Sequence, residues 1–280
     1  MNDLQAHYLD RFTPEVLFLF SVALMLLCIE IGFRIGTRGL HKAAKAQHSQ
    51  VRAIMGAALG LTAFMLAFTF ATAQSHFEIR VQGMLEEVAL ANDAFMQADL
   101  MPEPFRTDAR MLLRDYMGDR AAMAAASDED DLQEVFRLMQ RAEVLQDEMW
   151  AVGVAHARAA AVDRNLVAPA RGPFLDSVIG LMDIQTARLE AAISNRISGV
   201  IWYTLYLTGS LSMLIVGYQA SLVGRRSPMA TATLSIAFSA VLMLITDLDR
   251  PVMRFFEIDD SVVTDQVERM DRILAASTDE

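Results

Sequence analysis

The sequence predicts an all-α integral membrane protein with four transmembrane helices, arranged two plus two, and a helical-bundle domain inserted between the second and third spans. Three observations predict this class. Hydrophobic residues make up 54% of the 280 residues, they are concentrated in four long runs, and no segment alternates as a half-buried strand would. A run of about 20 apolar residues can cross a bilayer as a helix. The lipid bilayer is therefore the first expected partner.

Four apolar runs divide the chain into four regions. The runs cover residues 16–33, 54–73, 199–223 and 229–246. The regions are an N-terminal transmembrane helix pair (1–75), a helical-bundle domain (76–198), a C-terminal transmembrane helix pair (199–246) and an acidic C-terminal tail (247–280). The N-terminal residues lack the basic stretch of a signal peptide, and no small-residue cleavage site follows the first run. We therefore expect the first span to be retained.

Basic residues mark the two short loops between paired spans. The loops contain no acidic residue, and their basic residues are Arg34, Arg38, Lys42, Lys45 and Arg52 in the first and Arg225 and Arg226 in the second. Lysine and arginine accumulate in cytoplasmic loops, so the helical domain and both termini are expected outside the cytoplasm, on a multi-pass protein of the cell (inner) membrane. Residues 76–198 carry 12 arginines against 21 acids, which excludes nucleic acid as a natural partner of this domain.

The domain between the spans shows a helical spacing of apolar residues. This spacing continues from the second run past Phe77, so one helix should extend to the prolines of MPEP at 101–104. A second helix is expected from 105 to about 126, and a third begins after Ser127 as N-cap and ends at APARGP, 168–173. A fourth, from about 174, should lead directly into the third span. These helices predict an antiparallel bundle.

Small residues form a seam along the second span. At 100° per residue they occupy one narrow sector, and they are Gly56, Gly60, Ala63, Ala67 and Ala71. Such a seam, here with a GxxxG spacing, lets two helix backbones approach closely in lipid. It predicts packing against another span of the same chain or, as the alternative, contact between subunits.

A polar stripe lies nearly opposite this seam and consists of Thr62, Thr69, Thr72 and His76. A threonine hydroxyl in a membrane helix can bond the carbonyl one turn back, which would make the stripe purely structural. The alternative is that the stripe lines a water-filled pore. Hydroxyl residues recur at helical spacing in the third and fourth spans as well, and this pattern fits both interpretations.

Two ion pairs are expected at the ends of the spans. Glu30 precedes Arg34 by four residues, so the two side chains can pair on one helix face. The sequence DLDRP at 247–251 ends the fourth span, and Arg250 is expected to pair there with Glu78, with a solvated Arg250 as the alternative.

Motifs for catalysis are absent from the sequence. The five histidines form no close pair, the single cysteine is Cys28, and there is no glycine-rich phosphate loop or GxSxG elbow. We therefore expect no enzyme, no cofactor and no metal site.

Three stretches resemble the bestrophin-like family of bacterial membrane proteins, a domain family without an established activity. They are LGLTAFMLAFTFATAQSHFEIR at 59–80, EVALANDAFMQADLMPEPFRTDARMLLRDYMGDR at 87–120, and DLDRP at 247–251. The resemblance implies kinship with bestrophins, which are oligomeric anion channels whose helical domain is cytoplasmic, the opposite of the placement that the charges predict. The expected function is accordingly an oligomeric channel or pore, with inorganic anions as candidate ions. The alternative is a membrane-anchored, non-catalytic sensing or interaction module.

Overall fold

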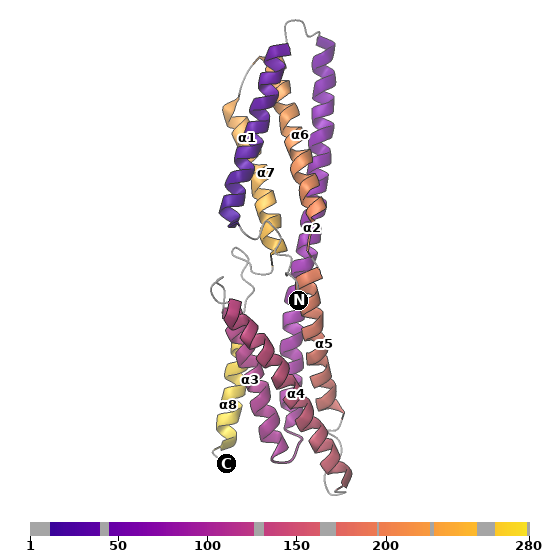
Figure 1. Cartoon of the computed structure of the whole chain (residues 1–280), viewed down its shortest axis with the longest axis vertical. Helices are drawn as coiled ribbons and strands as arrows, with labels where there is room; N and C mark the ends of the chain where they lie inside the picture. The colour runs from indigo at the N-terminus through magenta and orange to yellow at the C-terminus, as the bar shows by residue number, and fades with distance from the viewer. Residues whose placement is uncertain are drawn as a thin grey trace. The chain divides into compact units, whose positions relative to one another are not determined.

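The computed structural model describes residues 12–39, 45–125, 132–162, 172–194, 196–224, 227–250 and 261–278. These residues form eight α-helices and contain no strand, which confirms the all-helical class (Figure 1). The helices are α1 (Pro14–Gly39), α2 (Lys45–Ala98), α3 (Phe105–Ala125), α4 (Leu132–Val162), α5 (Pro173–Ser194), α6 (Gly199–Val223), α7 (Pro228–Asp249) and α8 (Ser261–Thr278).

Four of these helices contain segments that are long and apolar enough to cross a membrane. The segments are Pro14–Arg38, Ser49–Ala98, Gly199–Val223 and Pro228–Asp249. Each includes one of the four runs found in the sequence. The presence of four candidate membrane spans is thus confirmed by length and composition.

The chain divides into two compact units. Unit 1 comprises Met1–Glu78 and Ile193–Phe256, and unit 2 comprises Ile79–Ala192 and Glu257–Glu280. In unit 1, α1 packs along both α6 and α7 (Figure 1). Its core consists of completely buried apolar side chains, among them Met25, Leu205, Met213 and Ile245.

Glycines bring α1 and α6 into backbone contact. A Cβ atom added at Gly32 would overlap the carbonyl of Leu214, and one added at Gly217 would overlap the carbonyl of Ile29. Only glycine leaves room for this approach, which gives the pair its dispersion contacts in lipid, where helices gain little from the hydrophobic effect.

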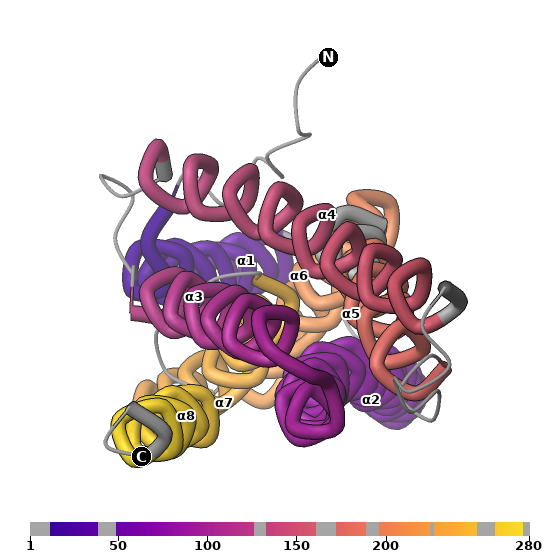
Figure 2. The backbone as a smooth tube through the Cα atoms, turned by 90° about the horizontal axis from the view of Figure 1, so that it is seen from below, coloured from indigo at the N-terminus to yellow at the C-terminus, as the bar shows by residue number. Residues whose placement is uncertain are grey.

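In unit 2, α3 lies between α4 and α8 (Figures 1 and 2). The unit has its own apolar core, and its largest completely buried side chains include Phe95, Leu113, Tyr116, Met149, Phe174 and Leu181. Since α2 contributes Phe95 to this core and Leu66 to that of unit 1, one helix supplies buried side chains to both units.

The C-terminal region contains a helix that the sequence analysis did not predict. Residues 247–280 were expected to be an acidic tail, and the structure adds a helix there, since α8 lies within this region and packs against α3. Val263 and Met270 are buried in the core of unit 2, and Arg114 Nε donates to Asp271 Oδ1 at 2.7 Å. The apolar residues of α8 recur at helical spacing, which the many acids of this region obscure.

The end of α2 agrees with the sequence prediction, whereas the boundary between α5 and α6 does not. The helix beyond Phe77 is confirmed as a continuation of α2, and α2 ends at Ala98, just before the prolines of MPEP. By contrast, α5 ends at Ser194 and α6 begins at Gly199, so the fourth domain helix does not lead directly into the third span. The expected N-cap at Ser127 and most of APARGP lie outside the described residues.

Candidate functional site

The membrane segment of α2 packs against α6 through its hydroxyl-bearing face. Thr62 is only 1% exposed, and its hydroxyl oxygen lies 2.8 Å from Ser212 Oγ on α6. The same hydroxyl donates to the carbonyl of Ala58 at 2.9 Å. Thr69 is also buried and donates to the carbonyl of Met65 at 2.8 Å. This face of α2 therefore belongs to the interior of unit 1.

These contacts correct the pore-lining assignment of two residues. Thr62 and Thr69 are already covered within one chain, so they cannot line a passage between subunits. Thr72 and His76, at the end of the same stripe, are half-buried. Thr72 donates to the carbonyl of Phe68 at 3.1 Å, and His76 Nδ1 has no hydrogen-bond partner in the described part of the chain.

The small-residue seam packs against no other residue that the structure describes, contrary to the first interpretation given to it. Gly56, Gly60, Ala63 and Ala67 are all exposed, and nothing lies within 4 Å of a Cβ atom added at either glycine. The backbone contact between α1 and α6 instead uses glycines that sequence reasoning missed. Gly32 and Gly36 have the same GxxxG spacing as Gly56 and Gly60, and this spacing was the signal that could have found them.

Two phenylalanines extend the exposed face of α2. Phe64 is 69% exposed and Phe68 is 66% exposed, and at 3.6 residues per turn both lie beside the seam. The packed face, with Thr62, Leu66 and Thr69, lies on the other side of the helix. Within unit 1, one face of α2 is therefore buried, with its threonine hydroxyls hydrogen-bonded. The other is a broad face of glycine, alanine and phenylalanine that no other described residue covers.

Glu30 and Arg34 form an ion pair on α1. Arg34 Nε donates to Glu30 Oε1 at 2.7 Å, and both side chains are exposed. An exposed pair at this spacing contributes only about 0.3–0.5 kcal/mol, so it has little weight in the stability of unit 1.

The DLDR residues join the ends of three helices in unit 1. Asp249, at the end of α7, accepts a hydrogen bond from the backbone N–H of Ile197 at 2.8 Å, just before α6 begins. Arg196 Nη2 lies 4.0 Å from the same carboxylate. Arg250 donates to the carbonyl of Phe12, just before α1, at 2.6 Å. The motif therefore fixes where α1 and α6 start relative to α7.

This arrangement corrects the expected pair between Arg250 and Glu78. Arg250 is buried at the end of α7, where the nearby carbonyl of Phe12 accepts its hydrogen bond. Glu78 is exposed on α2 and accepts from Gln74 Nε2 at 3.3 Å, one turn back on the same helix. The pair is not formed because the two side chains find different partners.

A buried polar cluster that the sequence analysis missed occupies the centre of unit 2. Glu87 on α2 is 2% exposed and accepts hydrogen bonds from Tyr116, from Arg120 and from Arg188. Arg120 Nε and Nη2 lie 2.7 and 2.8 Å from the two carboxylate oxygens. Gln146 on α4 donates to the Tyr116 hydroxyl at 3.3 Å. The Glu87 carboxylate thus joins α2 directly to α3 and α5, and Tyr116 extends the cluster to α4.

Burial shifts the pKa of two groups in this cluster and of one histidine. It raises the pKa of Tyr116 and lowers the pKa of Arg120, yet the two-point contact with Glu87 keeps the guanidinium charge compensated. His156 on α4 is 1% exposed, and neither ring nitrogen has a partner in the described ranges. Burial therefore lowers the pKa of His156. The sequence could have indicated the buried position of Glu87, because this acid lies among Met84, Val88 and Ala91 on the face of α2 that packs into the core.

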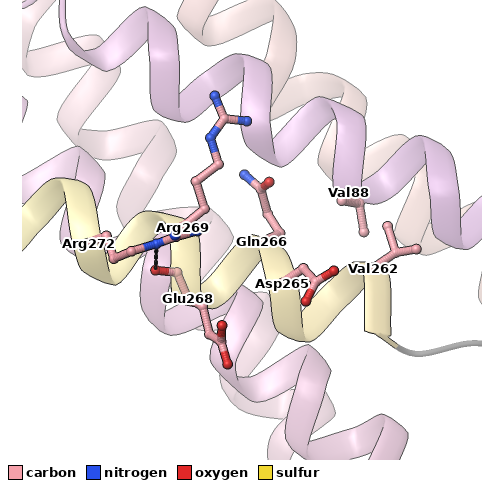
Figure 3. Close-up of a pocket in the computed structure, with 7 residues that line it drawn as sticks. All are labelled: Val88, Val262, Asp265, Gln266, Glu268, Arg269 and Arg272. Atoms are coloured by element: carbon pink, nitrogen blue, oxygen red, sulfur yellow. Dashed lines mark hydrogen bonds between the residues drawn. The ribbon is translucent and has the colours of Figure 1, made fainter.

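An open groove of about 550 Å³ lies between α8 and α2 in unit 2. Figure 3 shows Val88 of α2 facing Val262 of α8, with the polar side chains following along α8. Gln266 Nε2 and Arg269 Nη1 both donate to Asn92 Oδ1 of α2, at 3.0 and 3.1 Å. Arg272 Nε donates to the carbonyl of Glu268 at 3.3 Å. The groove combines exposed charges of both signs with a small apolar floor.

The described residues form eight helices, which include four candidate membrane spans, and one of these spans has an uncovered face. These features define an integral membrane protein of the all-helical class. A family model described as the Bestrophin-like domain matches residues 18–263. The chain belongs to this Bestrophin-like family, as the resemblance predicted. No curated protein matches the chain in sequence.

Solved structures with the same fold include a bacterial bestrophin homologue and a second membrane protein. A variant of a bacterial bestrophin homologue from Klebsiella pneumoniae has a TM-score of 0.52 at 13% identity, over 95% of this chain and 99% of that chain. A variant described only as a membrane protein has a TM-score of 0.58 at 14% identity, over 95% of this chain and 98% of that chain. At such low identity these likenesses establish the fold alone.

Proposed function

We propose that the protein is an oligomeric channel of the bestrophin-like type, in which copies of α2 meet through their uncovered faces around a common passage. The observation that carries this proposal is the exposed face of α2 with Gly56, Gly60, Phe64, Ala67 and Phe68. Membership in the Bestrophin-like family and the fold of a bacterial bestrophin homologue support it.

The composition of the exposed faces supports contact between subunits. The exposed residues of α1 include large aliphatic side chains such as Leu19, Leu27 and Ile35, which suit lipid. The exposed face of α2 has glycines and alanines beside its large side chains Phe64 and Phe68, and small residues are typical of helix–helix contacts in membranes. These small residues favour a contact between subunits over a face that meets only lipid.

The passage would be narrow and largely apolar along its middle. Phe64 and Phe68 project from the uncovered face, while Thr72 and His76 would supply polar groups toward its end. A hydrophobic constriction flanked by polar groups is one way in which channels gate. Inorganic anions are the ions that the family resemblance suggests.

The proposal also includes the placement of the chain in the membrane. The spans would be arranged two plus two, with the helices of unit 2 outside the bilayer. The seven basic residues of the two short loops support a cytoplasmic position for these loops. The helical domain and both termini would then lie outside the cytoplasm of the cell.

Flux through liposomes tests the proposal. Purified protein should carry ions across the membrane when it is reconstituted with a salt gradient, and a protein-free preparation should not. In a Cys28→Ala background, Ala67→Cys should make the flux sensitive to a charged thiol reagent, because Ala67 would face the passage. Leu19→Cys, exposed on α1, is the matched control and should leave the flux unchanged.

A preparation that is oligomeric but carries no ion under any gradient would contradict the channel. It would instead favour the membrane-anchored, non-catalytic sensing or interaction module, with unit 2 as its binding part.

A further inference from the structure

We propose that His156 is an acid-sensitive switch of unit 2: its uncharged ring closes the contact between the last turns of α4 and the start of α3, and protonation of the ring opens this contact. The proposal goes beyond the channel, because it assigns a conformational response to unit 2 alone. Under the proposed orientation, unit 2 lies outside the cytoplasm, where the pH follows that of the surroundings.

His156 occupies a core position of α4 where the helical pattern predicts an apolar side chain. The core-facing residues of α4 recur at alternating spacings of three and four residues, and they are Ala142, Leu145, Met149, Val152 and His156. The first three are buried, Val152 is partly buried against the same core, and His156 is 1% exposed. The histidine therefore belongs to the packed interior of unit 2.

The ring of His156 has an aromatic neighbour but no hydrogen-bond partner. Its centroid lies 5.5 Å from that of Phe105, the first residue of α3, and the two rings are tilted by 60°. Neither Nδ1 nor Nε2 has a hydrogen-bond partner among the described residues. A buried polar group without a partner lowers stability, and a leucine or methionine would fill the position without that cost. What the imidazole adds is the ability to take up a proton near neutral pH.

The start of α3, the last turns of α4 and the start of α5 meet around this position. A Cβ atom added at Gly153, one turn before His156, would lie 2.5 Å from the side chain of Leu175 and 3.2 Å from that of Phe174. Segments near helix ends open locally at a lower free energy than the middle of a packed helix. This end of unit 2 can therefore open while the Glu87 cluster at the centre of the unit stays intact.

No charge near the ring compensates a proton on it. His156 forms no ion pair with any residue that the structure describes. The charged residues on the elements that meet here are paired with one another or exposed, and they are Arg106 with Glu103, Arg110 with Asp99, and the exposed Asp108, Arg158 and Asp176. Burial therefore acts on the ring without compensation, and it lowers the pKa of His156.

Acid shifts the balance between the closed and open forms in a defined direction. In the open form water surrounds the ring, and its pKa is that of an exposed histidine, about 6.5. In the closed form the pKa is lower, so below about pH 6.5 the open form binds the proton more readily. The open fraction should therefore rise by up to about tenfold between about pH 7.5 and about pH 5.5.

Backbone hydrogen exchange of the full-length protein in detergent tests the switch. Rates are compared at each pH between the wild type and His156→Met, which cannot take up a proton, so the pH dependence of the chemical exchange rate cancels. In peptides covering residues 105–112 and 149–159, the ratio of wild-type to variant rates should rise by up to about tenfold from about pH 7.5 to about pH 5.5. Peptides of α8 should keep a constant ratio. His48→Gln, in the part of α2 that belongs to unit 1, is the matched control and should respond to acid as the wild type does.

A second measurement needs no variant. Exchange of the hydrogen on Cε1 of His156 in D2O, followed by mass spectrometry over days, reports both the pKa of the ring and its access to water. This hydrogen should exchange slowly, and the titration midpoint should lie below about 6.5.

A rate ratio that is the same at both pH values, or a midpoint at or above about 6.5, would overturn the switch. Neither measurement depends on ion flux, so this result would leave the channel proposal standing. A protein that shows the predicted rise in exchange but carries no ions would overturn the channel and support the switch.

Discussion

His156 and Glu87 are the buried side chains through which we expect pH and charge to change the stability of unit 2. His156 has no hydrogen-bond partner in the described chain, and burial lowers its pKa. A histidine with a depressed pKa in the folded state stabilises the fold fully above its unfolded-state pKa of about 6.5. That contribution is lost as the pH falls through the lower folded value.

We therefore expect the unfolding temperature of the detergent-purified protein to fall between about pH 7.5 and about pH 5.5, and His156→Leu to reduce this fall. Carboxylates titrate in both proteins, so their effect cancels in the comparison. Equal falls for the variant and the wild type would show that His156 is not the group responsible.

Glu87 provides a second prediction at this scale. Glu87→Gln would remove the only carboxylate that contacts Arg120 in the described structure, leaving a buried guanidinium uncompensated. Breaking a buried pair in this way costs about 3–5 kcal/mol. Trp150 fluorescence in a Trp202→Phe background would follow the unfolding of unit 2 in urea. Glu143→Gln, at an exposed position of α4, should change the free energy of unfolding by less than about 0.5 kcal/mol.

The residues of the candidate site were predictable only in part, because partners far apart in sequence decide their role. The spacing of Thr62 and Thr69 correctly placed them on one face of α2. It could not show that Ser212, 150 residues away, covers that face. Arg250 was likewise recognised as a specific donor, while its acceptor at Phe12 lies 238 residues away in the chain.

Among the helices, the contact of α1 with α6 makes the sharpest prediction. Gly32→Ala would place a methyl group against the backbone of Leu214, which cannot rotate away as a side chain could. Such overpacking costs about 1–3 kcal/mol, so the unfolding temperature of unit 1 should fall. Gly56→Ala, where the space is open, should not lower it, since alanine is the better helix former. Equal losses in the two variants would contradict this assignment of the seams.

Helices whose signals are local were predicted well, and those that depend on distant residues were not. Long apolar runs and the prolines at 102 and 104 identified the spans and the boundary between α2 and α3. The break between α5 and α6 depends on the Asp249 carboxylate, 52 residues further along the chain. The apolar stripe of α8 is short and interrupted by acids, so composition alone suggested a tail.

For the whole molecule, orientation is the prediction that most needs a measurement. A reporter active only outside the cytoplasm should be active when fused after residue 126, and one active only inside should be active at Gln47. The physical reason is the cost of moving the basic loop residues across the membrane. Reporter activity on the cytoplasmic side at residue 126 would place the domain as in bestrophins and contradict the proposed orientation.

The position of α8 in the chain has a consequence for biosynthesis. Its partner α3 is translated well before α6 and α7, whereas α8 follows both of them. The core of unit 2 therefore lacks Val263 and Met270 until the two apolar spans α6 and α7 have been made and inserted. During this interval the growing chain exposes the surface that α8 later covers, a natural substrate for chaperones. Ribosomes that stall after α7 would release chains with complete spans and an open unit 2, which quality-control proteases could recognise by that same surface.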